Sequence, residues 1–112
     1  MTPTTRPLDL TVESIQENGE VLVCLAGELD MYTAPALQER LEEVIAEPGT
    51  SAVVLELSRL SFIDSSGLSA IVMASRKLGD RGGELNLSGP SPAVRRVLEI
   101  TGISTVIPVR PT

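Results

Sequence analysis

The chain has 112 residues, of which 42% are apolar, and a formal net charge of −6. That length suffices for one domain with its own hydrophobic core, which aliphatic side chains must fill because the chain has one Phe, one Tyr and no Trp. The acidic balance disfavours nucleic acid and anionic membranes as partners, and the absence of histidine excludes Ser-His-Asp catalysis and the commonest zinc sites.

The first third of the chain predicts a hairpin. Residues 1–7 have the composition of a flexible tail, and we expect the single domain to span 8–112. Alternating side chains at 8–14 and an apolar run at 20–30 predict two strands, and the Glu-Asn-Gly sequence at 17–19 predicts the turn that joins them.

The next segment, residues 31–49, predicts a helix. Thr33 is the expected N-cap, and Pro35 lies in the first turn, where its missing N–H costs nothing. Pro48 and Gly49 supply the stop signal.

Strands and helices continue to alternate in the second half. The predicted elements are a strand at 51–58, a helix from Ser65 or Ser66 to Leu78 that Gly79 ends, a strand at 84–89, a helix that Ser91 caps and Gly102 closes, and a short last strand at 103–109. The order β-β-α-β-α-β-α-β predicts an α/β fold with a mostly parallel sheet of about five strands and helices packed on it. Functional groups in such sheets gather in the loops after the strands, here "GELDMYT" and "FIDSSG".

The single cysteine and the lack of long apolar segments bear on the expected compartment and chemistry. The one cysteine, Cys24, lies in an apolar run, where a buried and inert thiol is expected. No apolar run approaches the roughly 18 residues of a membrane span, and the first ten residues lack the apolar core of a signal peptide. We therefore expect a cytoplasmic protein without a cofactor or metal.

The sequence "LSFIDSSGLSAIV" (60–72) places two serines where a strand passes into a helix. If the helix begins at Ser66, Ser65 is its N-cap, and a cap alone would explain the residue. A functional interpretation adds phosphate, because a helix N-terminus accommodates an anion. Asp64 and the acids of "GELD" (27–30) would oppose that charge, and this combination suits a binding switch.

Two enzyme classes fit less well. A serine hydrolase lacks a histidine base here, and "DSSGL" is not the G-x-S-x-G motif. A two-component receiver domain would use Asp64 with Glu28 and Asp30 to hold magnesium, but it needs a lysine after a late strand, and the only lysine, Lys77, lies in a predicted helix. No phosphate-binding P-loop occurs either, so we expect no enzyme.

The segments "GELD" (27–30), "LSFIDSSGLSAIV" (60–72) and "GGELNLSGPSPAVRRVLEITGI" (82–103) resemble the STAS domain, and most closely the bacterial anti-sigma factor antagonists. The resemblance covers about residues 8–107. It implies a partner-switching phosphoprotein that regulates sigma-factor-dependent transcription. The unphosphorylated antagonist binds an anti-sigma factor with serine kinase activity, phosphorylation on the serine after the motif's Asp releases it, and a serine phosphatase reverses the modification.

Carried over to this chain, the resemblance implies phosphorylation on Ser65, with Ser66 as second choice. The implied partner surface comprises Glu28, Asp30, Tyr32, Thr33, Asp64, Ser65, Ser66, Gly67, Ser69 and Met73. The alternative within the same fold is a non-switching STAS scaffold module in a stress-signalling or transport-associated complex.

One feature departs from the family pattern. Members usually carry a further helix after the last strand, whereas this sequence has prolines at 108 and 111 in "VIPVRPT". The sheet face that such a helix covers is then open, or used in self-association, and we expect a monomer or weak dimer. A nucleotide site has no support besides the glycines of 79–83, which a turn explains.

Overall fold

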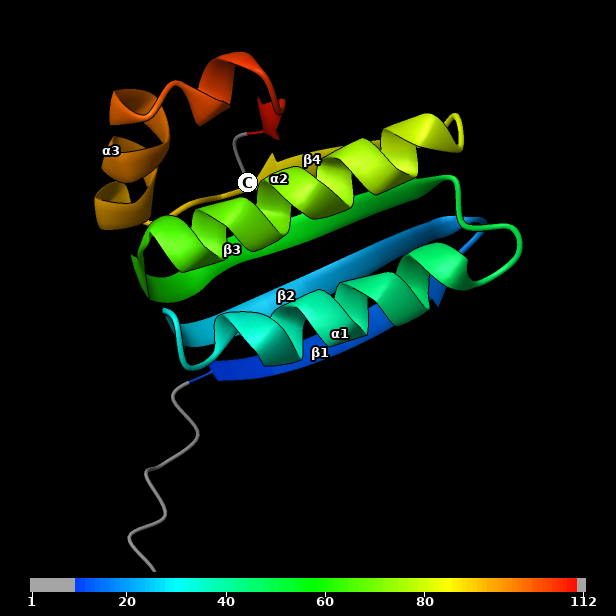
Figure 1. Ribbon diagram of the computed structural model, residues 1–112, viewed down its shortest axis with the longest axis horizontal. Helices are drawn as coiled ribbons and strands as arrows, with labels where there is room; N and C mark the ends of the chain where they lie inside the picture. The colour runs from blue at the N-terminus through cyan, green and yellow to red at the C-terminus, as the bar shows by residue number, and fades with distance from the viewer. Residues whose placement is uncertain (1–9, 111–112) are drawn as a thin grey trace, which may run out of the picture.

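The computed structural model describes residues 10–110, which form a five-stranded sheet with helices packed on it (Figure 1). The predicted tail at residues 1–7 lies outside the described residues. The elements are β1 (Leu10–Glu17), β2 (Glu20–Leu29), α1 (Ala34–Ala46), β3 (Ala52–Ile63), α2 (Ser65–Asp80), β4 (Glu84–Ser88), α3 (Pro92–Ile100), the 3-10 helix η1 (Ile103–Thr105) and β5 (Val109–Arg110). The predicted α/β fold with a mostly parallel sheet is confirmed.

The hairpin opens the sheet as predicted. β1 pairs antiparallel with β2 along its whole length, from Leu10 opposite Gly27 to Glu17 opposite Glu20. Asn18 and Gly19 form the turn with φ angles of 51° and 83°. Asn and Gly tolerate this left-handed backbone, and its twist matches that of the two strands.

The remaining strands are parallel, and the sheet order β1-β2-β3-β4-β5 follows the chain. Parallel neighbours need a crossover connection, which the helices provide. β2 and β3 are adjacent, and their register pairs Leu29 with Ile63 at the carboxyl ends. The loops after these two strands therefore leave the sheet at the same edge.

The core lies between the sheet and its helices. Figure 1 shows α1 and α2 side by side across the sheet, with α3 at the end where β3 finishes and α2 begins. Aliphatic side chains fill this layer, as the composition predicts, and the largest fully buried ones are Leu25, Leu29, Leu37, Leu41, Leu55, Leu57, Leu60, Ile71, Leu78, Leu87, Leu98 and Ile107. Within residues 10–110, none of the helices has the length and hydropathy needed to cross a bilayer.

Two helices differ in extent from their predictions. The first, predicted over 31–49, begins only at Ala34 and ends at Ala46, because the residues before it form a hydrogen-bonded turn. The second continues past its predicted stop at Gly79 to Asp80. The glycine that takes a left-handed conformation after this helix is Gly82, with a φ of 80°.

The predicted strand at 103–109 is wrong over most of its length. The N–H groups of Val106 and Ile107 both donate to the carbonyl of Ile103, at 2.9 Å each, so the chain satisfies these groups locally. Only Val109–Arg110 pair with β4. Ile107 is buried just as a strand residue would be, which is why the apolar pattern alone suggests a strand.

Candidate functional site

The two polar loops singled out in the sequence meet at one edge of the sheet. The N–H of Asp64 donates to the carbonyl of Leu29 at 3.1 Å, which links the ends of β2 and β3. One residue earlier, Glu28 is the register partner of Phe62. The acidic loop and the serine loop therefore share one end of the molecule, as the parallel strands predict.

Asp64, and not Ser65, caps α2. Its Oδ1 accepts the backbone N–H of Ser66 at 2.9 Å and that of Gly67 at 3.1 Å. The predicted cap at Ser65 is therefore wrong, because Ser65 is already the first residue of the helix. A carboxylate forms the stronger hydrogen bonds with these N–H groups, and the positive end of the helix favours its charge.

The two serines differ in exposure. Ser65 is exposed at the start of α2, whereas Ser66 is half-buried. Ser65 is therefore the more accessible of the two serines. Exposure distinguishes two residues that the sequence spacing alone could not separate.

Gly67 positions the start of α2. It is buried, and a Cβ built on it would lie 2.5 Å from Cγ of Leu29 and 3.0 Å from Cγ1 of Ile63. Such distances are far inside van der Waals contact, so only glycine lets the helix approach the ends of β2 and β3 this closely. Its contribution to the site is therefore packing beneath the loop.

Asp30 organises the other loop. Its Oδ1 accepts the N–H groups of Tyr32 at 2.9 Å and Thr33 at 3.0 Å. The hydroxyl of Thr33 accepts the N–H of Asp30 and donates to the carbonyl of Glu28, both at 2.9 Å. Thr33 occupies the predicted N-cap position of α1, but its side chain makes no cap bond to that helix. The pair instead holds the loop in a fixed turn.

The other predicted contact residues divide by exposure. Glu28, Tyr32, Ser69 and Met73 are exposed, and Tyr32 is 69% accessible. Sequence reasoning missed two exposed apolar residues at the same end, Met31 at 62% and Phe62 at 47% accessibility. Their positions next to the "GELD" and "IDSS" motifs are the signal that could have found them.

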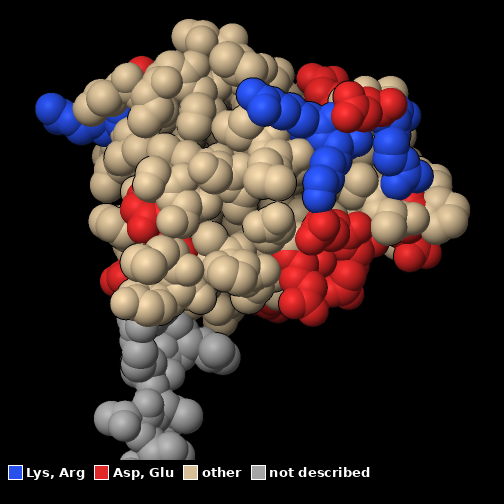
Figure 2. Space-filling view, viewed as in Figure 1, with Lys and Arg blue, Asp and Glu red and all other residues tan. Residues whose placement is uncertain are grey.

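Charge is unevenly distributed over the helical face. Figure 2 shows Lys, Arg, Asp and Glu gathered toward one end of this face, while the rest of it carries few charged side chains. The sequence explains the division, since the first charged residue of α1 is Glu39 and the first of α2 is Arg76. The serine end of both helices therefore offers an uncharged surface beside the acids of the two loops.

The same end has no basic residue in either loop. Residues 28–33 and 60–75 contain neither Lys nor Arg. Among the described residues, no three His, Cys, Asp or Glu side chains are grouped so that they could hold a metal ion. Glu28, Asp30 and Asp64 thus do not assemble the magnesium site of a receiver domain.

Cys24 lies away from this site, in the middle of β2. It is half-buried, and its register neighbours are Glu13 on β1 and Glu56 on β3. Burial raises the pKa of the thiol, and the carboxylates of Glu56 and Glu13 raise it further. A raised pKa keeps the thiol protonated and disfavours nucleophilic chemistry, in line with the expectation of an inert cysteine.

Comparison with known proteins identifies relatives along nearly the whole chain. The family model of the STAS domain matches residues 11–112. The chain is 36% identical over 95 residues to an anti-sigma-B factor antagonist of Listeria monocytogenes, covering 85% of this chain and 82% of the relative.

Two solved structures extend the likeness to three dimensions. The crystal structure of an anti-sigma factor antagonist from Mycobacterium paratuberculosis has a TM-score of 0.83 at 34% identity, covering 96% of this chain and 90% of that one. The Bacillus cell fate determinant SpoIIAA in its phosphorylated form has a TM-score of 0.69 at 26% identity, covering 89% of each chain. The chain therefore belongs to the STAS domain family, among the anti-sigma factor antagonists.

Proposed function

We propose that this protein binds an anti-sigma factor with serine kinase activity while Ser65 is unphosphorylated, and releases it once Ser65 is phosphorylated. A serine phosphatase resets the switch, and the protein itself is a ligand and substrate without catalytic activity. The observation that carries this proposal is the exposed Ser65 at the first turn of α2, beside a capping Asp64, in a member of this family.

The cap explains why a phosphate at Ser65 would work as a release signal. Asp64 already uses the N–H groups of Ser66 and Gly67, so a phosphate cannot be neutralised by them without displacing the carboxylate. Neither loop supplies a Lys or Arg to pair with it. At a separation of about 6 Å and an effective dielectric of about 20, repulsion between the phosphate and a carboxylate is about 3 kcal/mol per unit charge.

A docked partner would raise the free-energy cost of a phosphate at Ser65. It would have to remove water from a phosphate of charge about −1.5 to −2 that this chain leaves unpaired. Desolvating an unpaired charge costs free energy, and this cost is subtracted from what the surrounding contacts contribute to binding. The unphosphorylated loop, in contrast, presents a neutral hydroxyl, and the exposed side chains of Met31, Tyr32 and Met73 offer further contacts that a partner would cover.

The test uses three variants of one residue. Ser65→Asp should weaken binding by about 2–3 kcal/mol, which is about 30- to 150-fold in affinity, measured by calorimetry against the partner captured from native cells. Asparagine has nearly the same shape as aspartate but carries no charge, so Ser65→Asn should lose much less binding affinity. Ser65→Ala should abolish the mass gain seen after incubation with the cognate kinase and ATP.

Two results would contradict the proposal. Equal affinities for the wild type and Ser65→Asp would contradict the switch and favour a non-switching scaffold module. Phosphorylation of Ser65→Ala to the same extent as the wild type would move the modified residue elsewhere, with Ser66 tested next. Capture of an anti-sigma factor with serine kinase activity by the unmodified form, and not by Ser65→Asp, would support the proposal.

A further inference from the structure

Exposed apolar side chains are unevenly distributed over residues 10–110. Seven large ones are exposed, and one of them, Ile15, lies on β1. The other six lie in the loop before α1, at the end of β3, on α2, at the end of α3 and after η1, and they are Met31, Tyr32, Phe62, Met73, Ile100 and Val106. Isolated exposed apolar residues are ordinary, but a group of them on one part of a molecule indicates a protein-binding surface.

Ile100 and Val106 are the most exposed members of this group, at 75% and 78% accessibility. Neither is needed for packing. α3 buries Val94 and Leu98 against the core, and the segment after η1 buries Ile107. The stability of the fold therefore does not account for apolar side chains at the two exposed positions, which we call the α3–η1 corner.

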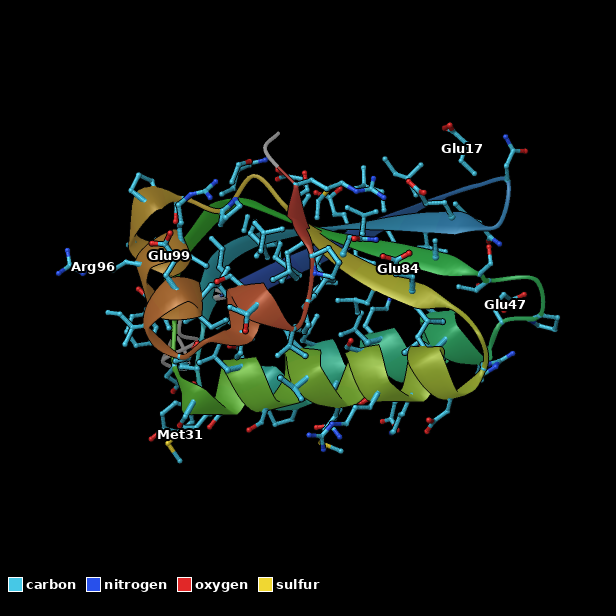
Figure 3. All side chains as sticks on the ribbon, turned by 90° about the horizontal axis from the view of Figure 1, so that it is seen from above. Glu17, Met31, Glu47, Glu84, Arg96 and Glu99 are labelled. Atoms are coloured by element: carbon cyan, nitrogen blue, oxygen red, sulfur yellow. The ribbon has the colours of Figure 1, made fainter. Side chains whose placement is uncertain are left out.

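The corner adjoins the serine end of the molecule. The hydroxyl of Ser91, which caps α3, donates to the carbonyl of Leu60 at 2.8 Å and so fixes the start of α3 to the end of β3. Figures 1 and 3 both show η1 next to α2, and Figure 1 places it on the side away from α1. No charged residue occurs from 100 to 109, and Figure 2 shows largely uncharged surface from the starts of α1 and α2 up to this corner.

The size of a stable interface favours one direction across this surface. A specific complex covers about 800 Å² and about 20–30 residues of each partner, which is more than the two loops around Ser65 contain. Along α1 and α2, a partner would meet charged residues from Glu39 and Arg76 onward. Toward α3 it meets Ile100 and Val106 instead, and the centres of interfaces are depleted in charge.

We propose that the anti-sigma factor bound at the serine loop makes a second contact with the α3–η1 corner, through Ile100 and Val106. This inference rests on the proposed function and adds a part of the interface whose own charge phosphorylation leaves unchanged. The partner presents an uncharged, apolar surface to the corner. The corner contributes equally to the binding of both forms, so it holds the kinase on its substrate while the serine loop determines release.

The test compares one substitution at three exposed apolar residues. The double variant Ile100→Gln/Val106→Gln should weaken binding of the anti-sigma factor at least about tenfold, measured by calorimetry. Ile15→Gln makes the same change on the sheet face opposite the helices and should leave the affinity unchanged. Because all three residues are exposed, the melting temperatures should change little. Equal losses at Ile15 and at the corner would overturn the second contact.

The kinase reaction provides an independent measurement. A contact far from the reacting hydroxyl is the same in the ground state and the transition state, so its loss raises KM and leaves kcat unchanged. The double variant should therefore raise the KM of the kinase for this protein about tenfold at constant kcat. A lower kcat at constant KM would mean that the corner acts on the position of Ser65, and it would contradict a holding contact.

Hydroxyl-radical footprinting measures the contact in the wild type, without a substitution. In the complex, Ile100 and Val106 should become protected together with Tyr32, while Ile15 stays reactive. A complex that protects Tyr32 and leaves Ile100 and Val106 reactive would reject the second contact alone. Equal affinity of the wild type and Ser65→Asp for the anti-sigma factor would instead reject the proposed function, so the two failures are distinguishable.

Discussion

At the scale of single residues, the sequence suggests that Ser65 both caps α2 and carries the proposed phosphorylation site. In the structure, the cap is Asp64. The carboxylate of Asp64 holds the first turn of α2 through two N–H groups, and the neighbouring serine is exposed without a share in that cap. The capping residue and the proposed phosphorylation site are therefore adjacent in the chain. A serine outside the cap is free to change its chemical state without unwinding the helix.

This division predicts different costs for two alanine substitutions. Asp64→Ala should lower the free energy of unfolding by about 1 kcal/mol, because the N–H groups of Ser66 and Gly67 lose their acceptor. Ser65→Ala should change it by no more than about 0.5 kcal/mol, the range of ordinary surface substitutions. Urea unfolding of the two variants measures both values. A larger loss of unfolding free energy for Ser65→Ala than for Asp64→Ala would show that Ser65 is the capping residue.

At the scale of elements, the contact between α2 and the ends of β2 and β3 determines where the serine loop lies. α2 contains two glycines, Gly67 in the first turn and Gly79 in the last. A Cβ on Gly67 would collide with Leu29, whereas a Cβ on Gly79 would meet nothing within 4 Å. Only the first glycine is required by packing.

The two glycines should therefore respond to alanine with opposite signs. Gly67→Ala should destabilise the protein by about 1–3 kcal/mol, since the added methyl group overpacks the helix against Leu29. Gly79→Ala should stabilise it by about 0.5–1 kcal/mol, because alanine is the better helix residue and loses less entropy on folding. Thermal unfolding of both variants decides the point, and a neutral Gly67→Ala would show that α2 can move away from β2 at little cost.

At the scale of the whole molecule, stability should depend on the state of Cys24 in the central sheet. The pKa of this thiol is raised above the ordinary value of 9.0, so the folded protein holds the proton more tightly than the unfolded chain. The resulting stabilisation is complete below pH 9.0, the unfolded value, and is lost as the pH rises through the folded value.

The measurement is urea unfolding across this alkaline range. The wild type should lose stability more steeply with pH than Cys24→Ala, which lacks the titrating thiol, and the two curves should run parallel well below pH 9.0. A Cys24→Ala variant with the same pH slope as the wild type throughout would show that the thiol does not couple to folding. The two register neighbours, Glu13 and Glu56, are the groups to neutralise next.

The sequence alone determined the order of strands and helices, the hairpin turn and the two loops that form the site. These features depend on local signals, since hydrophobic periods, turn residues and chain order act over a few residues. The meeting of "GELD" with "IDSSG" also follows from the sequence, because consecutive parallel strands place their carboxyl ends together.

Only the tertiary structure decided which group caps α2, where the last strand begins and which serine is exposed. Asp64 and Ser65 both suit a cap, and the extended backbone of Asp64 at the end of β3 selects the acid. The segment after Gly102 is apolar enough for a strand, but only Val109–Arg110 reach β4.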